Sequence, residues 1–190
     1  MARKIGLREF HQQVLKRLEN LAAAGTAGAS RLAVEIAGEN WLVDLASISE
    51  VIPLPPHVPV PLTHSWFLGM ANVRGNLYGI SDFAAFLGRG PTPAAAESRV
   101  LLLHPRFEVN AGLLVRRVYG LRGAEQFQPA DPGAASGAFV RAQWLAQDGG
   151  IWRELDLEAL ARDADFLNVG LYRRVDVVAS AAPAPGPASL

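Results

Sequence analysis

Two neighbouring segments of the chain carry an apolar residue at every second position, and this alternation constrains the fold more than any other feature. The apolar residues are Leu32, Val34 and Ile36 in the first segment, and Trp41, Val43 and Leu45 in the second. Side chains two residues apart lie on the same face of a β-strand, so each segment is typical of a strand with one buried face. The Gly38-Glu39-Asn40 sequence between them indicates a turn, and together they predict a β-hairpin.

Short apolar segments separated by turn residues continue along the chain. They predict further strands at residues 48–52, 67–73, 76–80, 100–103, 109–115, 118–121, 139–145 and 151–155. Many short strands with frequent turns are typical of small barrels or a sandwich, so the expected fold class is mainly β. Two helices are expected here: a short one capped by Ser81, and a closing helix at residues 157–166.

Residues 53–61 contain five prolines in nine positions. Proline lacks the N–H that a sheet requires, so this segment is expected to cross the surface in an extended conformation outside any sheet. An alternative is that the segment serves as a ligand for a proline-reading domain.

The two ends of the chain differ from its middle. Residues 1–30 are expected to form an amphipathic helix and a linker, because apolar residues recur there at spacings of three and four: Leu7, Phe10, Val14, Leu18 and Leu21. The helix packs on the protein's own core or on a partner, and the sequence leaves both open. Residues 179–190 are rich in Ala and Pro and are expected to be a disordered tail.

The charge balance and the lack of cysteine exclude several classes of protein. Eighteen basic residues balance eighteen acidic ones, and zero net charge argues against non-specific nucleic-acid binding, which needs a basic surface. The absence of cysteine excludes disulfides and thiolate chemistry. Because no signal peptide or long apolar run is visible, the protein is expected to be cytoplasmic, without direct membrane insertion.

Histidines and carboxylates show no catalytic or metal-binding pattern. The histidines are His11, His57, His64 and His104, and no pair has the spacing of a helical metal site. His57 and His64 flank the proline-rich segment, where the alternatives are two exposed loop histidines or a convergent pair. The sequence has no nucleophile elbow, phosphate-binding loop or dinucleotide fingerprint. It is therefore expected not to be an enzyme, and to need no cofactor or metal.

An ordered series of short motifs runs from residue 32 to about residue 162. Its members are Gly38, Asp44-Leu45, Glu50-Val51, Leu68-Gly69, Asn72-Val73-Arg74-Gly75, Asp82-Phe83, Ala111-Gly112-Leu113-Leu114-Val115 and Leu155-Asp156-Leu157. In order and spacing these motifs resemble the CheW family, the coupling proteins of bacterial chemosensory arrays. The second half departs from the family pattern at Arg116-Arg117 and at Arg141-Ala142-Gln143-Trp144.

The resemblance implies a fold and a domain organisation. It implies a CheW-like domain at residues 31–166, made of two SH3-like five-stranded β-barrel subdomains with a hydrophobic groove between them. The first barrel is expected at about residues 31–90, the second at about 97–155, and the closing helix at about 157–166. The N-terminal helix and the proline-rich segment exceed the usual pattern and are similar to the variant in pilus-linked chemosensory systems.

The resemblance also implies a function without catalysis. Proteins of this family bridge the cytoplasmic tip of a chemoreceptor to the regulatory CheW-like domain of a histidine kinase, in arrays at the membrane. For this chain it implies the same partners, assembly into such arrays with weak self-association allowed, and a role in twitching motility through type IV pili. The alternatives are a β-barrel module that binds a protein or small ligand outside chemosensing, and a hydrolase with a dispersed site.

Five residues are the candidate protein-binding residues: Asn72, Arg74 and Gly75 from one motif, and Glu50 and Val51 from another. Arginine carries a planar, permanently charged donor fork, and glycine permits close approach of a partner. A glutamate beside a valine suits the rim of an interface next to its core. Structural alternatives exist for each: a solvated turn arginine, a buried Val51 with Glu50 in water, and an Asn72 that satisfies turn backbone groups.

Overall fold

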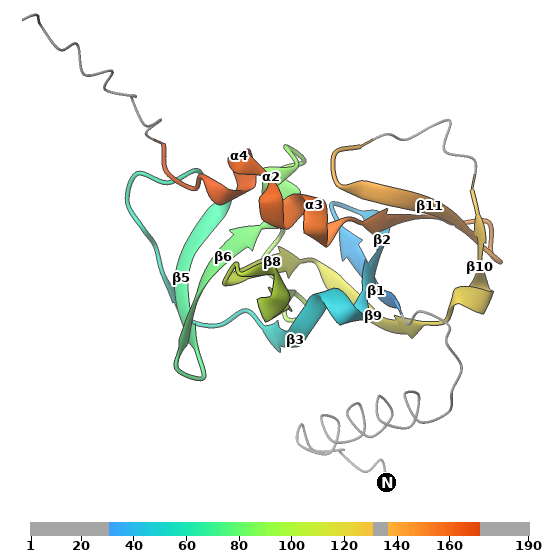
Figure 1. Cartoon of the computed structure of the whole chain (residues 1–190), viewed down its shortest axis with the longest axis horizontal. Helices are drawn as coiled ribbons and strands as arrows, with labels where there is room; N and C mark the ends of the chain where they lie inside the picture. The colour runs from blue at the N-terminus through green and yellow to red at the C-terminus, as the bar shows by residue number, and fades with distance from the viewer. Residues whose placement is uncertain (1–30, 131–136, 172–190) are drawn as a thin grey trace, which may run out of the picture.

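The computed structural model of the chain describes residues 31–130 and 137–171, so the expected N-terminal helix and the tail at 179–190 lie outside the described residues. Two six-stranded sheets lie side by side, and short helices run along one side of the boundary between them (Figure 1). The mainly β fold class is confirmed. In the part of the chain that the structure describes, no helix is long and apolar enough to cross a membrane.

The first sheet curls around a small aromatic interior. Its strands are β1 (Arg31–Ile36), β2 (Glu39–Asp44), β9 (Arg117–Arg122), β10 (Phe127–Pro129), β11 (Val140–Ala146) and β12 (Ile151–Leu155), in the order β10-β11-β12-β2-β1-β9. The predicted hairpin is confirmed, since β1 pairs antiparallel with β2 and Val34 lies opposite Trp41. Tyr119 of β9 contacts Trp152 of β12 with ring centroids 6.2 Å apart, although two strands separate them in the sheet. The sheet is therefore curled.

The second sheet curls in the same way. Its strands are β3 (Ile48–Pro53), β4 (His57–Val58), β5 (Phe67–Val73), β6 (Asn76–Asp82), β7 (Arg99–Leu103) and β8 (Ala111–Val115), in the order β3-β7-β8-β6-β5-β4. Ile52 of β3 and Val73 of β5 pack against one interior cluster, made of Ala71, Ile80, Val100, Leu102 and Leu114. Strands from opposite halves of the sheet thus face the same core.

The sheets do not correspond to the two halves of the chain. β2 pairs in parallel with β12, and β6 pairs in parallel with β8. Residues 48–115 build the second sheet, and residues on both sides of that range build the first, so the expected barrels at about 31–90 and 97–155 differ from the observed sheets. Alternation shows which face of a strand is buried but not which strand lies beside it. Each sheet also has six strands where five were expected, because the very short β4 and β10 add an edge.

The largest hydrophobic core fills the space between the sheets. It contains Leu32, Val34, Ile36 and Val43 from the first sheet, Leu101, Leu103, Leu113 and Val115 from the second, and Phe83, Leu160 and Phe166 from the helices. Burial of this many aliphatic and aromatic side chains is the main term that stabilises the domain. The groove that the family resemblance implies at this boundary stays a prediction.

Three aspartates of the family motifs begin helices. Asp44 caps η1 (Leu45–Ser47), Asp82 caps α2 (Phe83–Phe86), and Asp156 caps α3 (Leu157–Arg162). In each case a carboxylate oxygen accepts a hydrogen bond from a backbone N–H of the first turn, at 3.0, 3.2 and 3.0 Å. The expectation that Ser81 caps α2 is wrong, because the capping carboxylate belongs to the next residue, Asp82. The Asp-apolar pairs therefore have a structural purpose: they turn a strand into a helix.

The closing helix expected at residues 157–166 is two helices. Asp163 has extended backbone angles, with φ −70° and ψ 126°, so it ends α3. Its side chain then caps α4 (Ala164–Leu167) by accepting a hydrogen bond from Phe166 N at 2.8 Å. Two short 3₁₀ helices, η2 (Pro105–Phe107) and η3 (Ala124–Gln126), complete the described elements.

The proline-rich segment partly enters the second sheet, so the expectation that it lies outside any sheet is wrong at three residues. Pro53 ends the edge strand β3, where it lies opposite Arg99. His57 and Val58 form β4, where His57 lies opposite Ala71 of β5. β4 is an edge strand and has no proline of its own. Edge positions of this kind tolerate flanking prolines, because no neighbouring strand requires their missing N–H groups.

Candidate functional site

The turn between β5 and β6 holds the first candidate residue in an unusual conformation. Val73 lies opposite Asn76, so Arg74 and Gly75 are the whole connection between the strands. Their φ angles are +52° and +88°, which is typical of a type I′ hairpin turn. Asparagine or glycine is favoured at both central positions, and a left-handed backbone costs a residue such as arginine about 1 kcal/mol. Arg74 is thus held against its own backbone preference.

Asn72 and Gly75 stabilise this turn. Asn72 Oδ1 accepts a hydrogen bond from Gly75 N at 2.8 Å, which is the structural role considered for it in the sequence. A Cβ added at Gly75 would meet no atom within 4 Å, so the glycine is open on its outer side. Gly75 is needed for its backbone angle, and its open side leaves room for another molecule.

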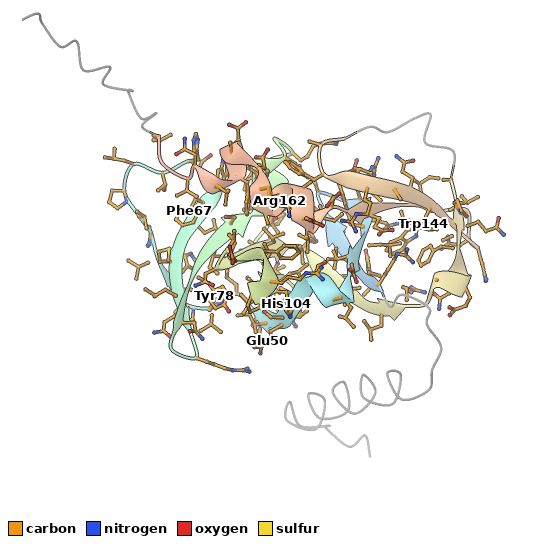
Figure 2. All side chains as sticks on the ribbon, in the orientation of Figure 1. Glu50, Phe67, Tyr78, His104, Trp144 and Arg162 are labelled. Carbon is orange, nitrogen blue, oxygen red and sulfur yellow. The ribbon has the colours of Figure 1, made fainter. Side chains whose placement is uncertain are left out.

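Arg74 pairs with Glu50 across the curled sheet. Arg74 Nη2 lies 2.7 Å from Glu50 Oε1, which joins the β5–β6 turn to β3. The arginine side chain is still 74% exposed, while that of Glu50 is 22% exposed. Figure 2 labels Glu50 on the lower face of the second sheet. The structure therefore brings together two candidates that are far apart in the sequence, and it leaves most of the guanidinium in solvent.

Val51 points away from this pair. It lies opposite Leu101 and packs against the core between the sheets, so it has a structural role. Leu77 is the exposed apolar residue beside the turn: it lies opposite Asn72 and is 57% exposed. Leu77 was not identified from the sequence. In the alternation of β6, Leu77 lies on the opposite face of the strand from Tyr78 and Ile80. An apolar residue on the polar side of a strand is the signal that could have found it.

Apart from this candidate binding site, the described residues 31–130 and 137–171 show no arrangement of side chains typical of a catalytic centre. His57 Nδ1 lies 3.0 Å from Pro55 O, and His64 stacks on Trp66 at 5.6 Å, so both have structural contacts. A cavity of about 360 Å³ opens at one end of the first sheet, lined by Arg122, Gln126, Phe127, Ala146, Gln147, Asp148 and Trp152. Its lining contains no histidine and no hydroxyl nucleophile. Within the same described ranges, no three histidines or carboxylates are placed to hold a metal ion.

Comparison with known proteins decides the family. The CheW-like domain family matches residues 31–165. The chain belongs to the CheW-like domain family. It is 29% identical over 148 residues to the protein PilI of Pseudomonas aeruginosa, which covers 75% of this chain and 80% of PilI.

A second relative and a solved structure agree with this assignment. The chain is 31% identical over 87 residues to a probable chemotaxis protein CheW of Rhizobium etli, across 46% of this chain and 56% of that protein. The crystal structure of the scaffolding protein TtCheW from Thermoanaerobacter tengcongensis has a TM-score of 0.57 at 20% identity, across 68% of this chain and 90% of that one. The resemblance seen in the sequence is confirmed.

The first departure of this CheW-like chain from the family pattern, Arg116-Arg117, is used for contacts within the domain. Arg117 pairs with Glu97 at 3.0 Å, and Arg116 N donates to Glu35 O. A backbone hydrogen bond and the bond from Arg117 hold the pKa of Glu97 below its usual value. Unlike Arg117, whose side chain is ion-paired, Arg116 has a buried Nε without a hydrogen-bond partner.

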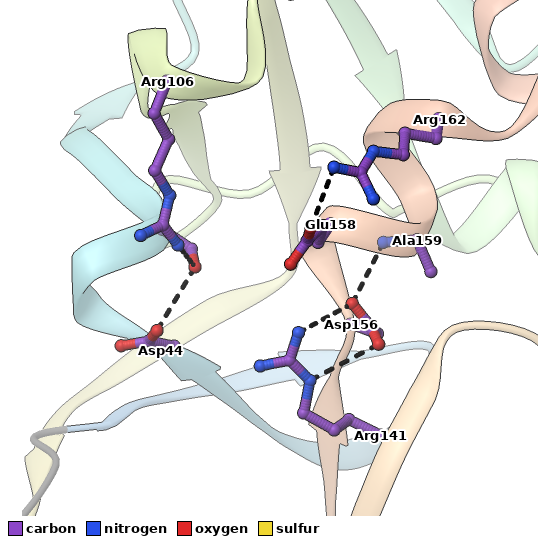
Figure 3. A network of polar contacts seen from close by, with 8 residues as sticks. Asp44, Arg106, Arg141, Asp156, Glu158, Ala159 and Arg162 are labelled. Atoms are coloured by element: carbon purple, nitrogen blue, oxygen red, sulfur yellow. Dashed lines mark hydrogen bonds and ion pairs between the residues drawn. The ribbon is translucent and has the colours of Figure 1, made fainter.

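The second departure from the family pattern, at residues 141–144, also makes contacts within the domain. Arg141 Nη2 lies 3.0 Å from Asp156 Oδ1, and the same carboxylate caps α3 at Ala159 N (Figure 3). Burial raises the pKa of Asp156, but the bonds from Ala159 N and Arg141 outweigh it and lower that pKa. Trp144 Nε1 donates to Glu154 Oε2 at 2.7 Å. These residues therefore stabilise the first sheet.

Proposed function

We propose that this CheW-like protein is a non-catalytic adaptor that couples a chemoreceptor to a CheA-type histidine kinase. We further propose that it acts in the pathway that controls type IV pili and twitching motility, at receptor arrays on the cytoplasmic side of the membrane. Membership of the CheW-like family supports the adaptor role. Similarity to PilI supports the pilus pathway.

One observation carries the assignment of the contact site: an exposed arginine is fixed in a strained turn by its own glutamate. The ion pair with Glu50 reduces the freedom of the Arg74 side chain, so less entropy is lost when a partner binds. The guanidinium has five N–H donors, and a single contact to Glu50 leaves others directed outward. Leu77 supplies an apolar surface beside this charge.

The proposed partner surface is therefore small and mixed in character. A carboxylate or backbone carbonyl would accept from Arg74, and an aliphatic side chain would cover Leu77. Contacts of this size are weak when made singly, and an array strengthens them by making several at once. Asn72 and Gly75 shape the turn, and Glu50 orients the arginine.

The test is co-purification of the full chain with a receptor signalling domain and with the regulatory domain of the kinase. Arg74→Ala should weaken capture of at least one partner by about tenfold or more, the usual range for a lost charged contact at an interface. Arg162→Ala is the matched control, because Arg162 is 78% exposed and is also ion-paired, with Glu158 at 2.9 Å. Equal capture of wild type and Arg74→Ala would refute Arg74 as a contact. Failure of the wild type to capture either domain would refute the adaptor function.

A second candidate is a small-ligand module, and the cavity at the end of the first sheet is the observation that favours it. Phe127 and Trp152 meet edge to face at 5.8 Å on its lining, with Arg122 and Asp148 nearby. An aromatic floor with flanking charges suits a planar polar ligand. If this function were correct, Trp152→Ala would abolish ligand binding and Arg74→Ala would not.

A further inference from the structure

The segment after β4 presents an uncharged apolar edge to solvent. Val58 and Leu62 are 71% and 58% exposed, and Val60 beside them is exposed as well. Residues 53–63 contain no Lys, Arg, Asp or Glu. β4 pairs with β5 alone, so one side of the strand has no neighbour in the sheet. Soluble proteins usually cover such an edge or place a charge on it.

The described chain ends on this edge. Thr63 forms a β-bridge with Gly170, and His64 N donates to Val169 O at 2.9 Å. Leu171 N then donates to Leu62 O, also at 2.9 Å. Figure 1 shows α4 and the residues after it reaching the far side of the second sheet, where this segment runs. The chain therefore continues beyond Leu171 from a point already hydrogen-bonded to the apolar edge.

The residues that follow suit an edge of this kind. The sequence from 172 to 178 is Tyr-Arg-Arg-Val-Asp-Val-Val. Counted in steps of two from Leu171, the residues are Arg173, Val175 and Val177, so two of the three are apolar. Four residues of extended chain span about 13 Å. Leu171 and Val175 are four residues apart, and so are Leu62 and Val58. In the antiparallel direction set by the bridge, Val175 can therefore reach Val58.

We propose that residues 172–178 dock along residues 55–61, opposite Val58 and Val60, and so cover this apolar edge. Tethering favours this segment over a second copy or another protein, because a neighbour joined to Leu171 has an effective concentration on the order of millimolar. The docked segment shields the second sheet from edge-to-edge pairing between copies. It would lie beside β4, which pairs with the β5 strand that leads to Arg74. The proposal is independent of the adaptor function.

The test uses disulfide trapping, which is simple here because the chain has no native cysteine. A disulfide requires Cα atoms about 4.4–6.8 Å apart, so it reports close approach. The double variant Val58→Cys with Val175→Cys is oxidised at low protein concentration in the full chain. Val58→Cys with Ser180→Cys is the control, since residue 180 lies on the same tail beyond the proposed segment. Both pairs are then repeated with Val177→Asp.

We expect the pair at 58 and 175 to close within the monomer at least tenfold faster than the pair at 58 and 180. Val177→Asp should remove that difference, because a carboxylate opposes burial against the apolar edge. Equal rates for the two pairs would overturn the proposal by showing that the segment is undocked. Disulfide-linked dimers as the main product would overturn it in favour of a second copy. Hydrogen exchange at the amides of Val58, Val60 and Leu62 gives an independent readout: protection should fall when 172–190 are removed and persist when only 179–190 are removed.

Discussion

Replacing Arg74 with glycine should leave the stability of the domain nearly unchanged while it removes the proposed contact. Glycine adopts the left-handed angle of this turn without strain, which recovers about 1 kcal/mol. The exposed ion pair with Glu50 is lost, at a cost of about 0–1 kcal/mol. The greater freedom of glycine in the unfolded chain costs about 0.5–1 kcal/mol. These terms nearly cancel, so the net change in the free energy of unfolding should be within about 1 kcal/mol of zero.

The measurement is urea unfolding of the wild type, Arg74→Gly and Arg74→Ala, followed by fluorescence of the four tryptophans. Arg74→Ala keeps the strained angle and loses the ion pair but avoids the entropy cost of glycine, so it should be less stable than Arg74→Gly by at most about 0.5 kcal/mol. Gly75→Ala serves as a control for the turn, because its φ of +88° should make it lose about 1 kcal/mol or more. Binding to the partner should fall equally in both Arg74 variants.

A loss of more than about 2 kcal/mol in Arg74→Gly would contradict this reasoning. It would mean that the Arg74–Glu50 pair holds the curled sheet together, and that the arginine is kept for folding. Binding defects of Arg74 variants would then be consequences of a damaged fold, and the contact site would have to be sought elsewhere.

Three further predictions concern stability. Asp82→Ala should cost about 2–4 kcal/mol in chemical denaturation, because the buried carboxylate accepts bonds of 2.6 and 2.7 Å from Thr92, and these donors would be left unpaired. The lowered pKa of Asp156 means that its stabilising contribution is present above the ordinary aspartate pKa of 3.8 and is lost as the pH falls through the lower folded-state pKa. Asp156→Asn should therefore flatten the acid side of a stability–pH curve, and an unchanged curve would contradict that role. Gly112→Ala should cost about 1–3 kcal/mol in thermal unfolding, because the added Cβ would lie 2.6 Å from Val100 Cγ1 inside the second sheet.

The sequence predicted the strands better than it predicted their neighbours. The β5–β6 hairpin was located to within two residues, because alternation and a two-residue turn are local properties. The parallel pairings of β2 with β12 and of β6 with β8 join distant parts of the chain, and no local pattern encodes them. β10 was missed because three residues are too short to show a period.

The candidate site was predicted in part for the same reason. Arg74 and Gly75 were found because they form one contiguous motif, and because that motif stands at the position expected from the order of motifs in the family. The pairing of Arg74 with Glu50 depends on the curl of the sheet, which brings β3 to the β5–β6 turn. The exposure of Leu77 likewise depends on which side of β6 faces solvent. The ion pair follows from tertiary structure alone, whereas the position of Leu77, out of phase with Tyr78 and Ile80, was already a signal in the sequence.

The strands of the first sheet lie before and after those of the second sheet in the sequence, and this determines the order in which the two sheets can be completed during synthesis. All strands of the second sheet lie within residues 48–115, so that sheet has its full complement early. The β1–β2 hairpin is made first, yet one side of β2 stays without its neighbour until residues 151–155 have left the ribosome. An unpaired strand edge is a site for aggregation, and long-range pairing of this kind is slow. Vulnerability of the nascent protein should therefore be concentrated at the β1–β2 hairpin, and a premature stop before β12 should be far more harmful than a premature stop after α4.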